Sequence, residues 1–377
     1  MSPLPRAARA PLTSKHPDVC PHCGSHVVAR RGTRKKKLEI VKLWQCASCK
    51  RVFTPGPAAL HNKTYPLRMI LSALTDYSLG YSLPKTAARL KKKTNRSVSP
   101  SMIANWLHEY RKHCSYRRLR ANGLARFRPE ETVRSIKLYH RQIYAYAYHR
   151  PKLEFLRAGT LDDKRAGGDA STVRFSSLAD FLEGIPTTCP HDLFRRDDDP
   201  KARASQARPQ FVDVSRIIVN RKENAATDAA ALIIPAVGNN KLRHETLQRF
   251  MLANDSVTVA IEIPIWLTET DIAALERQHG IALAPLDAAK PRVITGHIDF
   301  LQVRNGAVHI LDYKPDARTN KPIAQLAIYA LALTRLVPGL KLFDIKCAWF
   351  NEEEYLEFFP RTLFSPPQLG FAGKRRK

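Results

Sequence analysis

The chain has 377 residues, of which 44% are hydrophobic and 8% aromatic, so we expect roughly two or three domains and at least one sizeable core. Its net charge of +28 is concentrated, because residues 1–150 hold 31 lysines and arginines against 6 acidic residues, whereas residues 151–377 hold 31 against 28. There is no run of about 18 apolar residues and no apolar block near the start, which disfavours a membrane span and secretion. We therefore expect a cytoplasmic protein, associated with the nucleoid if the source is prokaryotic.

The basic first 150 residues favour a polyanionic partner. Each phosphate that a lysine or arginine neutralises releases counterions, so such binding depends steeply on salt. DNA is the first partner to consider, RNA stays open, and the alternative is a solvated basic surface that only keeps the protein soluble. Acidic lipid is disfavoured because neither a basic amphipathic helix nor a lipidation motif is evident.

Four of the seven cysteines form two C-x-x-C pairs, Cys20 with Cys23 and Cys46 with Cys49. Each pair places two thiolates on one turn, and the 22 residues between the pairs suffice for a hairpin that brings the turns together. The run Leu38–Trp44 predicts a half-exposed strand in that hairpin. Four thiolates would close a structural Zn²⁺ site, with disulfides or a redox motif as alternatives.

Three helices are predicted after a Pro-rich break at 54–58. An apolar stripe at i, i+3, i+4 and i+7 runs over 67–74, a second helix covers 83–90, and a third follows Ser99 after a polar turn at 91–97. This order predicts a helix-turn-helix whose third helix enters the major groove, and an ordinary helical hairpin with a basic loop is the alternative. The candidate base readers are Ser101 and Asn105, and the candidate phosphate contacts are Lys91, Lys92, Lys93 and Arg96.

The first 115 residues resemble the amino-terminal part of insertion-sequence transposases. The resemblance is carried by the ribbon CPHCG…WQCASCKRVFTP and the helices GYSLPKTAARL…SPSMIANWL. It implies sequence-directed DNA binding, usually at the ends of a mobile element. No transposase core of the DDE type is recognisable in the remainder of the chain.

Residues 118–160 are basic and aromatic, with Tyr139, Tyr144, Tyr146 and Tyr148 among arginines and histidines. Tyrosines among cations can stack on bases, but at helical spacing we favour packing against a neighbouring domain. We predict a helical connector here, followed by a polar, glycine-containing linker at 159–170.

The second half contains a predicted β-hairpin with acidic residues. The runs 293–303 and 306–314 are β-rich and separated by an Arg-Asn-Gly turn. Strand alternation puts Asp312 and Lys314 on one face, and Asp299 of the partner strand can add a second carboxylate. Such a set can bind Mg²⁺ or Mn²⁺, while the lysine orients water or shields charge on a phosphodiester.

Further motifs surround this hairpin in a characteristic order. A Ser-x-Leu…Cys-Pro segment begins near residue 176, His244 lies on a predicted helix, Glu262 precedes Ile-Pro, and Gln325 stands four residues before Tyr329. Together with Gly-x-x-Asp and Asp-x-Lys, they resemble the RecB-like nucleases of the PD-(D/E)XK superfamily over about residues 175–360.

This resemblance implies a role for each matching residue. His244, Asp299 and Asp312 would be ligands of Mg²⁺ or Mn²⁺, Lys314 the catalytic lysine, Gln325 with Tyr329 a supporting motif, and Glu262 a further acidic contributor. Some relatives hold an iron–sulfur cluster, but only Cys189 and Cys347 are available for one here, so we predict none. No Walker A motif is present, so a helicase motor would be a separate partner chain.

The sequence thus predicts a multidomain α/β protein that acts as a metal-dependent DNA nuclease. Two alternatives are a non-catalytic DNA-binding regulator that derives from a transposase, and an active transposase. A homodimer and a mobile-element partner are further expectations. The predicted parts are a zinc ribbon at 15–56, a helix-turn-helix at 62–116, the connector and linker at 117–170, a nuclease core with a mixed sheet flanked by helices at 171–365, and a basic tail at 366–377.

Overall fold

The chain forms two compact units, and each unit is built from several separate segments of the sequence. In this computed structural model the described residues are 17, 19–35, 40–54, 64–159, 175–195, 203–204, 217–237, 240–283 and 292–364. The first unit comprises Met1–Thr132, Asn224–Ser256 and Asn351–Glu353, and the second comprises Val133–Glu223, Val257–Phe350 and Glu354–Lys377. The predicted linker from residue 160 and the basic tail at 366–377 lie outside the described residues.

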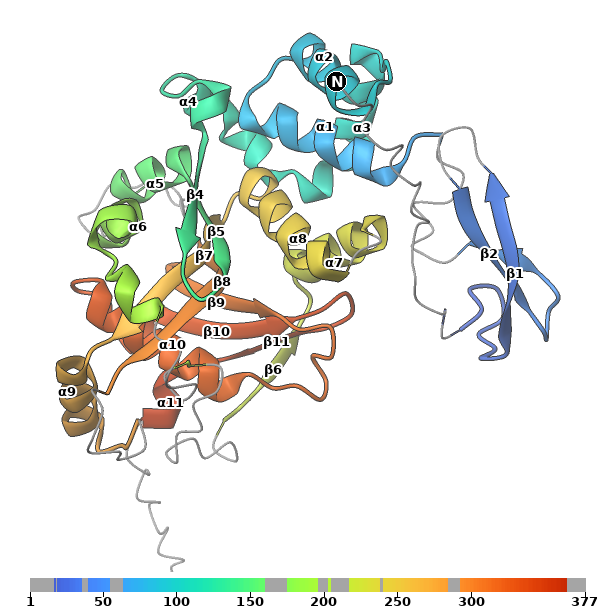
Figure 1. Cartoon of the computed structure of the whole chain (residues 1–377). Coiled ribbons are helices and arrows are strands. Elements are labelled where there is room, and N and C mark those ends of the chain that lie inside the picture. The colour runs from blue at the N-terminus through green and yellow to red at the C-terminus, as the bar shows by residue number, and fades with distance from the viewer. Residues whose placement is uncertain are drawn as a thin grey trace, which may run out of the picture. The chain divides into compact units, whose positions relative to one another are not determined.

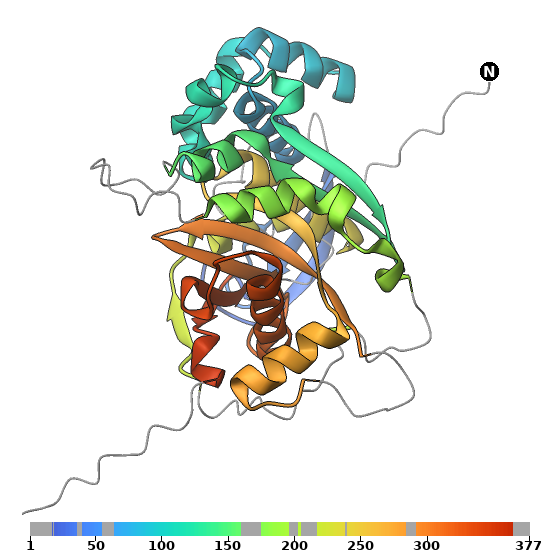
Figure 2. The ribbon, with the colours of Figure 1, turned by 90° about the vertical axis from the view of Figure 1, so that its left-hand side faces the viewer.

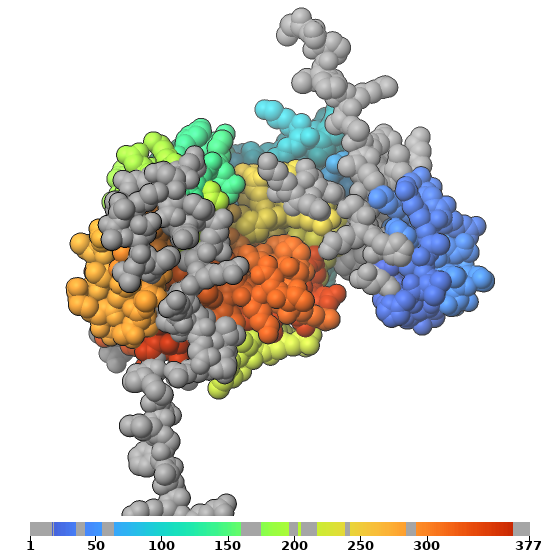
Figure 3. All heavy atoms as spheres, turned by 60° about the horizontal axis from the view of Figure 1, so that its bottom comes forward, coloured from blue at the N-terminus to red at the C-terminus, as the bar shows by residue number. Residues whose placement is uncertain are grey.

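A small antiparallel sheet carries the cysteine pairs. Its strands are β1 (Val28–Lys35), β2 (Ile40–Cys46) and β3 (Val52–Phe53). Trp44 and Phe53 are buried with Cys20 and Cys46 in a core of their own, and the blue atoms of this ribbon form one packed lobe in Figure 3. The strand expected at 38–44 is therefore present as β2, with residues 38 and 39 outside the described part.

Three helices follow in the first unit, as predicted. They are α1 (Leu67–Leu79), α2 (Leu83–Thr94) and α3 (Pro100–Glu109). Ser82 and Ser99 cap α2 and α3, each accepting a hydrogen bond from a backbone N–H of the first turn. The second helix continues beyond the predicted 83–90 and ends at Asn95, whose left-handed conformation stops it. The turn before α3 is accordingly shorter than the expected 91–97.

Helices from later in the chain complete the first unit. The remaining α-helices of this unit are α4 (Arg120–Leu124), α7 (Ala225–Ile233) and α8 (Asn240–Asn254). Buried Asn254 of α8 accepts a hydrogen bond from Ser78 at 2.8 Å and donates one to Thr75 at 3.0 Å, both on α1. Residues 224–256, which we assigned to the nuclease core at 171–365, thus group with the first unit.

The second unit is built on an eight-stranded mixed sheet (Figure 1). Its strands are β4 (Val133–Tyr139), β5 (Ile143–His149), β6 (Asn220–Lys222), β7 (Thr258–Leu267), β8 (Ile294–Arg304), β9 (Ala307–Tyr313), β10 (Ile345–Phe350) and β11 (Tyr355–Phe358). The order is β4-β5-β7-β8-β9-β10-β11-β6, and only the pair β9–β10 is parallel. The predicted mixed sheet flanked by helices is confirmed.

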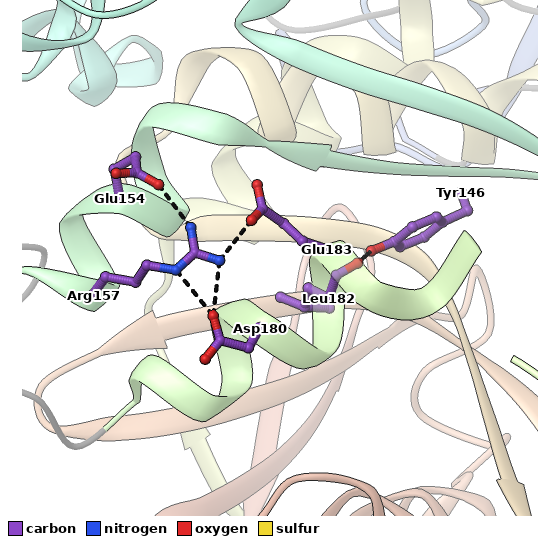
Figure 4. Close-up of polar contacts among 6 residues, drawn as sticks. All are labelled: Tyr146, Glu154, Arg157, Asp180, Leu182 and Glu183. Carbon is purple, nitrogen blue, oxygen red and sulfur yellow. Dashed lines mark hydrogen bonds and ion pairs between the residues drawn. The ribbon is translucent and has the colours of Figure 1, made fainter. Parts of the chain in front are cut away.

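The helical connector expected at 117–170 is wrong over its middle part, where β4 and β5 form two strands of the sheet. The tyrosines at 144, 146 and 148 alternate with small or apolar residues, which is the period of a strand and not of a helix. Tyr146 is fully buried and its hydroxyl donates a hydrogen bond to the carbonyl of Leu182 (Figure 4). The tyrosines therefore pack within the unit that contains them.

Helices cover the sheet of the second unit. They are α5 (Arg150–Arg157), α6 (Ser176–Thr188), α9 (Glu269–His279), α10 (Ile323–Leu336) and the short α11 (Arg361–Phe364). Arg157 ties α5 to α6 through Asp180 at 2.9 Å and Glu183 at 2.6 Å (Figure 4). Helices α9 and α10 both lie below the strands in the view of Figure 2, and Arg335 of α10 forms an ion pair with Asp271 of α9. Within the described residues, every helix is too short or too polar to cross a membrane.

Candidate functional site

The hairpin of β8 and β9 brings the two predicted aspartates together. Its two-residue turn, Asn305-Gly306, has positive φ at both positions, as a tight hairpin requires. Leu301 pairs with Ile310, so Asp299 and Asp312 lie next to that pair on the same face. The backbone N–H of Tyr313 donates to Asp299 Oδ2 at 3.3 Å, which fixes this carboxylate against β9.

Lys314 directly follows β9, and its side chain forms an ion pair with the carboxylate of Asp312. Its Nζ lies 3.0 Å from Oδ1 and 2.8 Å from Oδ2 of that carboxylate. Its backbone N–H donates to the carbonyl of Phe350 on the parallel strand β10 at 2.9 Å. Both ends of the lysine are thus held, and the predicted Asp-x-Lys arrangement is present in the structure.

Asp312 is buried beside a second carboxylate, that of Asp299. Asp312 is only 3% exposed, and its burial together with the charge of Asp299 raises its pKa well above the ordinary value, despite Lys314. Burial by itself would lower the pKa of Lys314, but the carboxylates of Asp312 and Asp299 raise it overall. A hard divalent cation would favour the charged forms of these two neighbouring carboxylates, so the pair suits such an ion.

Glu262 adds a third carboxylate from β7. A carboxylate oxygen of Glu262 lies within 4.8 Å of one of Asp299. Its backbone has φ 52°, a left-handed conformation that is unusual for a residue with a side chain and rare inside a strand. The neighbouring pairs Ile261 with Phe300 and Ile263 with Ile298 hold it there. Such strain, typically of order 1–2 kcal/mol, concentrates at functional sites.

Helix α10 supports the site through the predicted Gln325 and Tyr329. Gln325 Nε2 donates to the Tyr329 hydroxyl at 2.8 Å. The tyrosine ring lies so close to Gly296 of β8 that a Cβ there would be 2.5 Å from ring atom Cε1. The glycine of the Gly-x-x-Asp motif is thus explained by the close approach of α10, a link between two motifs that sequence reasoning missed.

His244, the remaining predicted ligand, lies on α8 in the first unit and is partly buried. The carboxylates and Lys314 all belong to the second unit. The role of His244 as a ligand of the same ion stays a prediction.

The four cysteines of the ribbon form a cluster that fits a structural metal ion such as zinc. Their sulfurs lie within 4.8 Å of one another. Cys20 Sγ is 3.7 Å from Cys49 Sγ, and Cys23 Sγ is 3.6 Å from Cys46 Sγ. Zn–S bonds of about 2.3 Å in a tetrahedron place sulfurs about 3.8 Å apart, so the cluster has nearly the size of an occupied site. The N–H groups of Cys49 and Ser48 lower the pKa of Cys46 to about 6, which favours the metal-binding thiolate.

The candidate DNA contacts in the first unit differ in their surroundings. Ser101 in the first turn of α3 and Asn105 in its middle are exposed, although the Ser101 hydroxyl lies 2.9 Å from that of Ser99. Lys91 and Lys92 are exposed in the last turn of α2, and Arg96 is partly exposed in the following turn. Lys93 is different, because its Nζ lies 2.8 Å from the buried carboxylate of Asp76.

A second cluster, of histidines, was missed by the sequence reasoning. His140, Cys189 and His191 of the second unit have nitrogen and sulfur atoms within 4.8 Å of one another. The spacing Cys-x-His at 189–191 was a signal for it, but His140 lies about 50 residues earlier and only the fold brings it close.

Comparisons with family models, curated proteins and solved structures gave no match to this chain.

Proposed function

We propose that the chain is a metal-dependent deoxyribonuclease that hydrolyses phosphodiester bonds and is brought to DNA by its ribbon and three-helix segment. The observation that carries the proposal is the meeting of Asp299, Asp312 and Lys314 with the strained Glu262 on three adjacent strands. Acidic groups alone are common on proteins, but the buried carboxylate of Asp312, with Asp299 beside it and a lysine held against it, suits the chemistry of a phosphodiesterase.

Each of these residues has a task that follows from its chemistry. A bound Mg²⁺ or Mn²⁺ would polarise the phosphate and make an attacking water more acidic. Asp299, Asp312 and Glu262 would supply the oxygen ligands, with His244 as the expected nitrogen ligand. Lys314, released from its pair with Asp312, would orient the water or offset the charge that grows on the phosphate. Gln325 and Tyr329 would position this set by packing against β8.

The DNA-binding part of the proposal is supported by charge and helix arrangement. The first 150 residues carry most of the net positive charge, and α3 presents Ser101 and Asn105 to solvent after a short turn. A helix presented this way can read base edges, while the lysines at the end of α2 contact phosphates. The resemblance to transposases makes a role in a mobile element part of the proposal.

The test is cleavage of end-labelled linear and supercoiled DNA, single- and double-stranded, with Mg²⁺, Mn²⁺ or EDTA. We expect metal-dependent cutting by the wild type and a loss of at least about 100-fold in Asp312→Asn and Lys314→Ala, as for removal of one electrostatic contributor. Asp316→Asn is the matched control, since Asp316 is an exposed carboxylate two residues after Lys314. An RNA substrate is assayed in parallel.

A non-catalytic DNA-binding regulator is the second candidate. It is favoured by the ion pair itself, because Lys314 already neutralises Asp312 without a cation. Tight DNA binding without cutting under all conditions would support this candidate and contradict the nuclease. Cutting that survives in both variants would contradict the assigned site, and joining of strands would indicate a transposase.

A further inference from the structure

We propose that His140, Cys189 and His191 form a second transition-metal site in the second unit, separate from the carboxylate site and suited to Zn²⁺. The three residues come from different segments: the turn between β4 and β5, the end of α6, and the start of the 3-10 helix His191–Phe194. All lie in one unit, so the unit's own fold brings them together.

The donor atoms converge as ligands of one ion do. Nε2 of His140 lies 2.9 Å from Nδ1 of His191, and the cluster with Cys189 Sγ spans at most 4.8 Å. Zn–N bonds of about 2.0–2.1 Å place tetrahedral ligand nitrogens about 3.3–3.4 Å apart, so the two rings need to separate by only a few tenths of an ångström. Two imidazoles and a thiolate favour Zn²⁺ over the hard cations that carboxylates bind.

A further histidine orients the cluster. Nδ1 of His140 lies 2.8 Å from Nε2 of His297 on β8. When Nδ1 carries the proton and donates it to His297, Nε2 keeps its lone pair for the ion, which is the usual support of a metal-binding histidine. Burial, then the neighbouring His191, lowers the pKa of His140 to about 4, consistent with a neutral ring.

Aromatic rings hold these imidazoles in place. The ring of Phe194 stacks on His140 at 4.2 Å between centroids, and that of Tyr144 stacks on His297 at 3.4 Å. Cys189 is buried at 6% exposure. The ligands are therefore positioned before an ion arrives, which reduces the cost of ordering them. Three protein ligands leave a fourth position for water.

The experiment is the zinc content of the full chain, measured after reconstitution with Zn²⁺ and gel filtration. All proteins carry Asp299→Asn and Asp312→Asn, which disable the carboxylate site; on this background we expect two ions per chain, and one when Cys189→Ser or His191→Ala is added. The controls Cys347→Ser and His279→Ala remove a buried thiol and a partly buried imidazole of the same unit outside the cluster, and both should keep two ions. One ion on the unchanged background, or two after Cys189→Ser or His191→Ala is added, would show a hydrogen-bonded histidine chain without metal.

A spectroscopic measurement covers the case in which these variants fold poorly. In the double variant Cys20→Ser/Cys46→Ser the ribbon site is removed, and one Co²⁺ should still bind with the weak charge-transfer band of a single thiolate. That band should disappear when Cys189→Ser is added. Absence of the band in the double variant would overturn the proposal, and DNA cleavage is not needed for either result.

Discussion

Asp312 shows a conflict between stability and function at a single residue. Its pKa is raised by burial and by Asp299, so between the unfolded value of about 3.9 and the raised value the folded state binds more protons than the unfolded state. Stability therefore falls as the pH rises through this window when no cation is present. Lys314 limits the effect but does not remove it.

We expect Asp312→Asn to be more stable than the wild type in EDTA at pH 8, although the proposed function predicts that it does not cleave DNA. Asp299 still faces Lys314, so the lysine is not left without a carboxylate. A difference of about 1 kcal/mol corresponds to about 2–4 °C for a unit of about 200 residues, such as the second unit, which contains Asp312. Melting temperatures from pH 5 to pH 9 check this, because the gap should widen with pH and close when Mn²⁺ is added. An equal or lower melting temperature of the variant would contradict the electrostatic account.

Glu262 allows a backbone effect to be separated from a side-chain effect. Glu262→Gln keeps the left-handed backbone, whereas Glu262→Gly relieves it. Both should lose cleavage, and the glycine variant should be more stable than the glutamine variant by about 1 kcal/mol. Urea unfolding of the two proteins measures the difference. Equal stabilities would mean that the conformation is not strained.

At the scale of elements, the packing of α10 on β8 depends on the absence of a side chain at residue 296. Gly296→Ala would push a methyl group into the ring of Tyr329. We expect a loss of about 1–3 kcal/mol, as for overpacking of a core, and reduced cleavage because Gln325 moves with the ring. Gly184→Ala in α6 is the control, since its Cβ would meet Thr188 at an ordinary 3.6 Å. Thermal unfolding and cleavage of both variants are the readouts.

The last turn of α2 contains lysines with different tasks. Replacing Lys91 and Lys92 by alanine should lower DNA affinity and reduce the slope of log K against log salt by about 1 for each lost phosphate contact. Lys93→Ala should instead lower the stability of the helical segment, since Lys93 is paired with buried Asp76. Salt titrations of DNA binding and melting curves separate these outcomes. A salt slope that Lys91→Ala/Lys92→Ala leaves unchanged would contradict the assignment of α2 to the DNA interface.

At the scale of the whole molecule, the chain crosses more than once between its two units. The segment Asn224–Ser256 belongs to the first unit, where Asn254 is hydrogen bonded to α1. Deletion of residues 1–132 should therefore expose this segment and remove the two hydrogen bonds of Asn254 to α1, at a cost of about 0.5–1.5 kcal/mol for each bond. Limited proteolysis should cut within 224–256 in the shortened chain but not in the full one. Equal resistance in both would show that α7 and α8 do not depend on α1.

Local patterns in the sequence determined a substantial part of this protein. The cysteine pairs, the helices α1 to α3 and the β8–β9 hairpin with its Asn-Gly turn follow from spacing, period and turn chemistry, which act over a few residues. The same alternation placed Asp299 near Asp312 and Lys314. These features could be predicted because neighbours along the chain decide them.

Only the tertiary structure decided which distant segments meet. The strands β4 and β5, the left-handed backbone of Glu262, the ion pair of Lys93 with Asp76 and the fit of Gly296 to Tyr329 each depend on a partner far along the chain or on the register of a sheet. The cluster of His140 with Cys189 and His191 is of the same kind. A period in the sequence reveals which face of an element is buried, but the identity of the group that covers it is set by long-range packing.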